Sequence, residues 1–285
     1  MKLFLPIVLL VCSAWPQSAD PANHTPASAP AQDSAPAMHP SSTNKDDVTG
    51  RQAKEVIQQA IQALGGDAWL NIRDREQQGR GYSLHHGRPS GPGTIFWSFS
   101  EFPDKERDEL TKERDVAELY VGNKGYEITF KGVHPADEKE VVDYMRRRRF
   151  SLDNVLRTWV NDPTVVIIYE GNAIAAQHPS LKVTLINSKN EKVSLYFDLF
   201  THLPIRKTFE WRDPVDRQIN LEEEIYENYK WVPGGVMAPF NVTRYFNGDM
   251  SSQRFYNSVT INQGLDESMF DPHSGYNPNK PVKKH

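Results

Sequence analysis

The segment Phe197-Asp198-Leu199-Phe200-Thr201-His202-Leu203-Pro204-Ile205-Arg206 lies between two runs of residues with strand character. Lys192 to Leu199 and Pro204 to Trp211 each have the length of an ordinary strand, and the residues between them form a turn. Runs of the same kind, with period-two alternation, extend in both directions along the chain. This pattern predicts a mainly β (α+β) fold with about 10–11 antiparallel strands.

Helical signals occur before the first strand and again in the middle of the chain. Thr49 and Gln52 form a capping box ahead of an apolar stripe that ends at Gly65-Gly66, which predicts an N-terminal helix. Between Pro135 and Val160, apolar residues at helical spacing predict two short helices. We expect this helical pair to cover the sheet as a lid.

The beginning of the chain differs in composition from the rest. Residues 1–19 combine the basic Lys2, an apolar run and small residues, which is the layout of a secretory signal peptide. Cys12 raises the alternative of a lipid anchor. Residues 20–48, rich in Pro, Ala and Ser, are expected to be a disordered linker. We therefore predict a domain at 49–273, a flexible tail at 274–285, and a periplasmic or secreted location.

Composition argues against several classes of protein. The net charge of −4 gives no broad electrostatic reason to expect nucleic acid as a partner. The mean hydropathy of −0.63 argues against a membrane-spanning bundle. No nucleophile elbow, phosphate loop or dinucleotide fingerprint occurs, and His85-His86 would point to opposite faces of a strand. We therefore predict no catalytic residue, no cofactor and no metal site.

Four motifs mark turns and element ends of the domain. They are Phe197 to Arg206, Tyr229 to Pro239, Val259 to Asp266 with Met269-Phe270-Asp271-Pro272, and Ala63-Leu64-Gly65-Gly66. Together they resemble the LolA-like and LolB-like proteins of the outer-membrane lipoprotein-sorting superfamily, over roughly residues 50–272. The resemblance implies an incomplete antiparallel β-barrel that helices close on its concave side, around an apolar cavity for lipid acyl chains. Because these motifs are structural turns, they identify the fold better than the function.

Large apolar residues on the predicted strands are the candidates for lining such a cavity. They are Trp97, Phe99, Leu119, Tyr126, Phe130, Phe197, Phe209, Trp211, Tyr229 and Trp231. The lid is expected to face the sheet through Val141, Tyr144, Met145, Leu152, Leu156 and Trp159. The alternative is that these residues form an ordinary core beneath a static helical cap.

Charged residues gather in three regions. Arg146 to Arg149 is interpreted as a loop between the lid helices, which either contacts anionic headgroups or is simply solvated. Lys105 to Thr111 is predicted to be an exposed, edge-like strand. The acidic stretch from Asp104 to Asp115 and the run Glu222-Glu223-Glu224 are expected to be solvated strand faces.

These features favour a monomeric, non-catalytic periplasmic carrier of hydrophobic cargo, either lipid or the acyl chains of a lipoprotein. A membrane surface or an envelope protein is a further partner consistent with the pattern. The alternatives are a structural or interaction domain of the cell envelope with a filled core and, less favoured, a hydrolase that uses scattered polar residues.

Overall fold

The first and last strands of the domain pair with each other, and this seam organises the sheet. β1 (Asp74–His85) and β14 (Asp249–Ile261) are antiparallel neighbours within one 14-stranded sheet. The computed structural model describes residues 42–279. The predicted signal peptide, and the predicted linker up to residue 41, lie outside the described residues.

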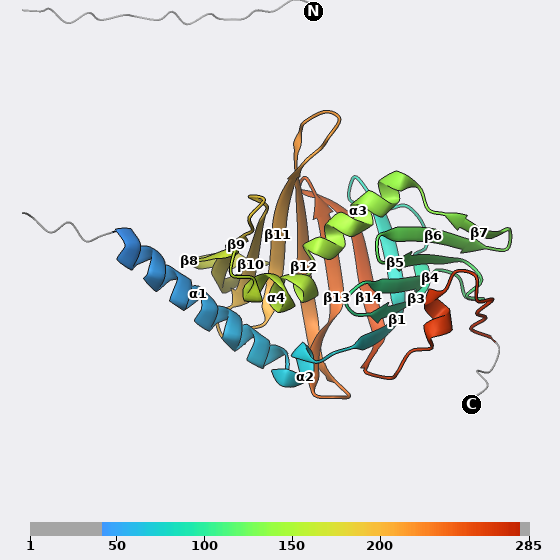
Figure 1. Ribbon diagram of the computed structural model, residues 1–285, viewed down its shortest axis with the longest axis horizontal. Coiled ribbons are helices and arrows are strands. Elements are labelled where there is room, and N and C mark those ends of the chain that lie inside the picture. The colour runs from blue at the N-terminus through green and yellow to red at the C-terminus, as the bar shows by residue number, and fades with distance from the viewer. Residues whose placement is uncertain (1–41, 280–285) are drawn as a thin grey trace, which may run out of the picture. The chain divides into compact units, whose positions relative to one another are not determined.

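Two antiparallel meanders lead away from this seam (Figure 1). On the β1 side lie β2 (Arg88–Pro89), which pairs with β1, and then β3 (Thr94–Glu101), β4 (Lys105–Glu109), β5 (Ala117–Val121), β6 (Lys124–Thr129) and β7 (Gly132–Pro135). On the β14 side lie, in order outward, β13 (Val236–Phe246), β12 (Ile219–Val232), β11 (Pro204–Arg212), β10 (Lys192–Asp198), β9 (His178–Ile186) and β8 (Val166–Ala175). The outermost strands, β7 and β8, do not pair with each other, so the sheet is an incomplete barrel, as predicted.

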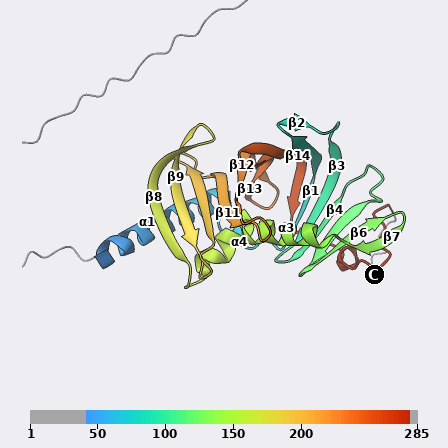
Figure 2. The same cartoon turned by 90° about the horizontal axis from the view of Figure 1, so that it is seen from above.

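Helices precede the sheet, connect its two outer strands and follow its last strand. The elements are α1 (Ser42–Leu64), α2 (Asp67–Leu70), α3 (Glu138–Arg149), α4 (Leu152–Arg157) and the 3-10 helices η1 (Trp159–Asn161) and η2 (Glu267–Phe270). Figure 2 shows the sheet bent into two arms, with α3 and α4 crossing between them. The predicted helical pair is therefore confirmed. Within residues 42–279, no helix is both long enough and apolar enough to cross a membrane.

The start of α1 differs from the prediction. The helix begins at Ser42, so Thr49 lies inside it and is not its cap. The predicted apolar stripe is nevertheless the face that packs on the sheet. The largest core cluster joins Ala53, Val56, Ile57, Ala60 and Leu64 of α1 with Val155 and Leu156 of α4 and with Val183, Leu185, Val193, Leu195 and Phe197 of the sheet.

The segment Phe197 to Arg206 forms the turn between β10 and β11. The Asp198 carboxylate accepts hydrogen bonds from the backbone N–H groups of Phe200, at 3.0 Å, and Thr201, at 2.7 Å. His202 completes the turn with a φ of 59°. An aspartate that satisfies the backbone of its own turn explains why a short sequence motif marks this hairpin.

The prediction that β4 is an exposed edge strand is wrong. β4 lies between β3 and β5, and Arg107, Asp108 and Glu109 are buried. The Arg107 guanidinium pairs with the Glu109 carboxylate at 2.8 Å and also donates to the Met269 carbonyl at 3.2 Å, so charge on that face is compensated by the C-terminal segment. The strand count exceeds the prediction in part because β2 and β7 span only two and four residues, too short to show alternation.

We expect the seam to be sensitive to a single methyl group at Gly79. A Cβ atom there would lie 2.1 Å from the carbonyl oxygen of Phe255, at the point where the register of β1 and β14 shifts. Gly79→Ala should lower the free energy of unfolding by roughly 2–3 kcal/mol in urea denaturation, because backbone has to move. Gly81→Ala is the control, since its Cβ would meet nothing nearer than 3.7 Å. Similar losses for both variants would contradict this account of the seam.

Candidate ligand-binding cavity

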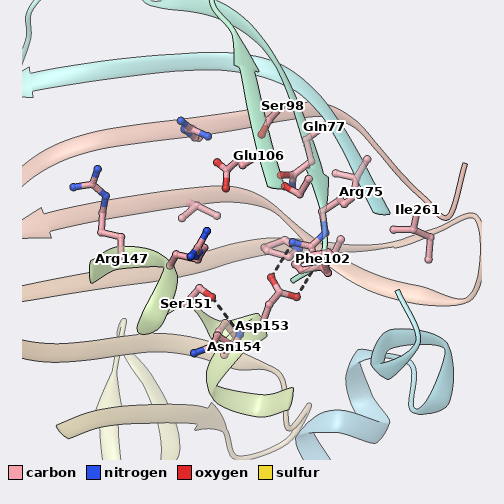
Figure 3. A pocket seen from close by; sticks show the side chains of 18 of the residues that line it. Arg75, Gln77, Ser98, Phe102, Glu106, Arg147, Ser151, Asp153, Asn154 and Ile261 are labelled. Carbon is pink, nitrogen blue, oxygen red and sulfur yellow. Dashed lines mark hydrogen bonds and ion pairs between the residues drawn. The ribbon is translucent and has the colours of Figure 1, made fainter. Parts of the chain in front are cut away.

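A cavity of about 480 Å³ lies between the concave face of the sheet and the lid helices α3 and α4. Its walls come from β1, β3, β4 and β5 on one side and from β12, β13 and β14 on the other. Figure 3 shows Arg75, Glu106 and Arg147 directed into this space. The volume falls within the range of roughly 300–1,000 Å³ that is typical of small-molecule sites.

Part of the cavity lining is apolar and lies beside Arg75 and Gln77 of β1. We call it the apolar corner, and it consists of Leu64, Trp69, Val236, Ala238, Val259 and Ile261. These residues come from the end of α1, from α2, and from the adjoining ends of β13 and β14. They also belong to the largest core cluster, so the corner is where the edge of the core meets the cavity.

The opposite side of the cavity carries three carboxyl groups. We call it the acidic wall, and it consists of Glu106 and Asp108 of β4 and Glu118 of β5. Strand alternation places Glu106 and Asp108 on one face, and Asp108 lies directly across from Glu118 in the register of β4 and β5. The cavity is therefore not the uniformly apolar hollow that the resemblance implies.

The acidic wall is only partly neutralised. Asp108, which is 6% exposed, accepts from the Arg254 guanidinium at 2.9 Å through Oδ2, but its buried Oδ1 has no partner in the described structure. Burial, followed by the nearby Asp108 carboxylate, raises the pKa of Glu106 to about 7. Loss of hydration and the same neighbour raise the pKa of Glu118. Proton uptake or an incoming cation would relieve this concentration of negative charge.

The wall formed by β12 and β13 is compensated internally. Glu224 accepts from the buried Lys207, at 2.8 Å, and from Arg244, at 3.0 Å. Although burial alone raises the pKa of Glu224, these two cations hold it well below its usual range. Removing one partner of such a group leaves an uncompensated buried charge, so this cluster has a structural role.

The lid is tied to the sheet by polar and aromatic contacts. The rings of Tyr144 and Tyr120 stack with centroids 3.7 Å apart, and the Tyr144 hydroxyl donates to Glu106 at 3.0 Å. At the other end of the lid, Arg75 of β1 makes two hydrogen bonds to Asp153 of α4, at 2.8 and 3.0 Å. These contacts hold α3 and α4 over the cavity without filling it.

The interpretation of Arg146 to Arg149 as a loop is wrong, because the four arginines form the last turn of α3. Arg146 stacks on Trp211 and pairs with Glu222, whereas Arg148 donates to the carbonyl oxygens of Asp104 and Gly122. Arg149 pairs with Glu191. Arg147 is the one of the four that lines the cavity without a hydrogen bond or ion pair to the rest of the described chain.

The structure distributes the predicted cavity residues over four environments. Tyr229, together with Tyr144 and Leu152 of the predicted lid, lines the cavity. Phe197, Phe209, Trp211, Leu156 and Trp159 belong to or pack against the largest core cluster, and Trp97, Phe99, Leu119 and Tyr126 pack in a second cluster with Met269 and Phe270. Phe130 and Trp231 are 84% and 62% exposed, respectively. Val141 and Met145 are half-buried on α3, outside the cavity lining.

Sequence reasoning missed the charged lining. The expectation that Asp104–Asp115 and Glu222–Glu224 are solvated faces fails at Glu106, Asp108 and Glu224, which face the cavity. The sequence carries no signal for this outcome, because the alternation of Glu106 and Asp108 with Arg107 and Glu109 also fits an exposed edge strand.

Comparisons with known proteins identify the fold. A DUF1329 family protein from Desulfovibrio piger matches with a TM-score of 0.54 and 10% identity, over 76% of this chain and 96% of that one. A putative outer membrane lipoprotein-sorting protein domain from Vibrio parahaemolyticus matches with a TM-score of 0.51 and 12% identity, over 77% and 97%. The chain therefore has a LolA-like fold, which confirms the resemblance found in the sequence. No protein-family model matches the chain, and no curated protein matches its sequence.

Because the pKa of Glu106 is raised, we expect the free energy of unfolding to depend on pH through this residue. Its folded pKa of about 7 lies above the ordinary 4.5, so between these values the folded state binds more protons than the unfolded state. Glu106 therefore lowers the free energy of unfolding as the pH rises from 4.5 to 7. Relative to wild type, Glu106→Gln should raise the free energy of unfolding more at pH 8 than at pH 4.5, and the two effects should differ by on the order of 1–3 kcal/mol.

Thermal unfolding at both pH values measures this effect. Glu210→Gln, on an exposed position of β11, makes the same chemical change away from the cavity and should show no such difference. A stability change for Glu106→Gln that is equal at pH 4.5 and pH 8 would show that the carboxyl is already ionised without cost.

Proposed function

We propose that this chain is a binding protein of the bacterial cell envelope that carries an amphiphilic, lipid-type ligand in the cavity beneath α3 and α4. The observation that carries the proposal is that the cavity lining combines the apolar corner with charged side chains, namely the acidic wall and Arg147. An apolar tail in the corner would continue the packing of the core, and each buried methylene contributes about 0.8 kcal/mol. A polar headgroup would meet the charged side chains.

The LolA-like fold supports a carrier role. One of the similar structures is described as a putative outer membrane lipoprotein-sorting protein domain. At 12% sequence identity, this similarity shows a shared fold and nothing more. The predicted signal peptide at 1–19 agrees with a periplasmic or secreted location, and Cys12 would instead give a lipid-anchored form. We therefore place the protein in the envelope.

The acidic wall and Arg147 narrow the class of cargo from the one that the sequence predicts, which is lipid or the acyl chains of a lipoprotein. Lipoprotein acyl chains alone would leave Asp108 Oδ1 and the Arg147 guanidinium facing the cavity without partners, at a cost in free energy. A ligand with a tail and a charged headgroup occupies both ends of the cavity. Binding requires no catalytic residue, so we propose a non-enzymatic role.

The proposal predicts that lipid accompanies the protein and that filling the cavity removes it. The purified chain should yield lipid on organic extraction and mass spectrometry, at about one molecule per chain. Val242 lines the cavity, and Val242→Trp should reduce this yield severalfold because the indole takes up ligand volume.

Val166→Trp is the matched control, since Val166 is 57% exposed on β8 and outside the cavity. Circular dichroism should show that both variants are folded. Wild-type protein that contains no lipid and takes up none from vesicles of a bacterial total lipid extract would overturn the proposal.

A further inference from the structure

We propose that the headgroup bound in this cavity is zwitterionic, with a primary ammonium group held by the acidic wall and an anionic group held by Arg147. This inference rests on the proposed function, because it identifies the headgroup of the same amphiphilic ligand. Phosphoethanolamine is the simplest group that combines the two charges.

The acidic wall contains acceptors without matching donors. Asp108 Oδ1 is buried and has no partner, although Arg254 satisfies the other oxygen of the same carboxylate. Glu106 has a neutral donor, Tyr144, and no cation within ion-pair distance among residues 42–279. Glu118 makes neither a hydrogen bond nor an ion pair with any described residue. Asp108 and Glu106 therefore face the space with unused acceptor capacity, and Glu118 adds a solvent-exposed carboxylate to the lining.

A primary ammonium group matches this arrangement. It supplies three N–H donors and one positive charge from a compact centre. A quaternary ammonium group has the charge but no N–H donors, so it would leave Asp108 Oδ1 unsatisfied. The chemistry of the wall therefore favours an amine over a choline-type headgroup.

Arg147 provides the opposite charge. It lines the cavity from α3, and Figure 3 shows its guanidinium and the Glu106 carboxylate directed into the same hollow. Burial, followed by the neighbouring Arg244, lowers the pKa of Arg147, although the negative charges of Glu222 and Asp143 act in the opposite direction. A phosphate offers the planar guanidinium two parallel hydrogen bonds.

The two sites lie on opposite sides of the space, because Arg147 belongs to the lid and the carboxyls belong to the sheet. A ligand with separated positive and negative groups would join the lid to the sheet at that point. An anionic lipid without an amine would satisfy Arg147 but would be repelled by the acidic wall. This contrast makes the inference testable with lipids of equal chain length.

Isothermal titration calorimetry at pH 8 with short-chain lipids below their micelle concentration tests the inference. The probes are dihexanoyl phosphatidylethanolamine, phosphatidylcholine and phosphatidylglycerol, together with free phosphoethanolamine. We expect the ethanolamine lipid to bind roughly tenfold more tightly than the other two lipids, the difference expected from one charge-assisted contact. The free headgroup should bind more weakly than its lipid because it cannot use the apolar corner.

Two substitutions separate the two charges. Glu118→Gln should weaken the ethanolamine lipid roughly tenfold and leave the glycerol lipid no weaker, whereas Arg147→Gln should weaken both. Glu118 has no structural partner in the described chain, so its substitution should leave the fold intact. The controls are Glu210→Gln on β11 and Arg149→Gln, which belongs to the same arginine run but does not line the cavity.

The outcomes distinguish this inference from the function on which it rests. Equal affinity for the ethanolamine, choline and glycerol lipids, or an ethanolamine affinity unchanged by Glu118→Gln, would overturn the zwitterion inference and leave a lipid-binding function in place. Free phosphoethanolamine that binds as tightly as its lipid would support the charge recognition and overturn the amphiphile proposal. If no probe binds, both are overturned.

Discussion

The path of the chain from β7 to β8 constrains the rest of this structure. These strands are the two edges of one antiparallel sheet, so the connection between them has to cross the open side of the bent sheet. The connection consists of α3 and α4, which therefore lie over the concave face. A lid and a covered cavity follow from this topology. The largest core cluster joins α1, α2 and α4 with the arm from β8 to β14. The helix α3 instead reaches the other arm through contacts such as Tyr144 on Tyr120, and the cavity is the space that remains between these two sets of contacts.

The charges beneath the lid are arranged in two ways. Around Glu224 and Asp153, each carboxylate has at least one cationic partner, and these clusters join strand to strand and sheet to lid. Around Asp108 and Glu106, donors are fewer than acceptors. Buried ionic groups contribute little net stability even when paired, so the unbalanced cluster beside the cavity is the part of the lining where we propose that a ligand headgroup binds.

The sequence predicts local features of this protein well and distant pairings poorly. The turn at Asp198 depends on hydrogen bonds within a few residues, and the lid helices depend on apolar spacing with caps at Asp137 and Ser151, so both are visible in the sequence. The fate of a charged residue depends on partners elsewhere in the chain. Asp108 and Arg254 are 146 positions apart, and only the pairing of β1 with β14 brings them together. Without that register, a buried acidic strand cannot be distinguished from a solvated one. The aromatic residues that were expected to line a cavity cannot be assigned to one face of the sheet or the other either.

The pairing of the first strand with the last also determines when the protein can finish folding. As a chain is delivered from its N-terminus, β1 gains β3 early but lacks its other neighbour until β14 arrives. The outer face around Phe99 and Leu119 waits still longer, because Met269 and Phe270 cover it. An incomplete chain therefore exposes an open strand edge and an apolar face during nearly all of its synthesis, and such surfaces are prone to aggregation. Truncation near the C-terminus would make this transient state permanent.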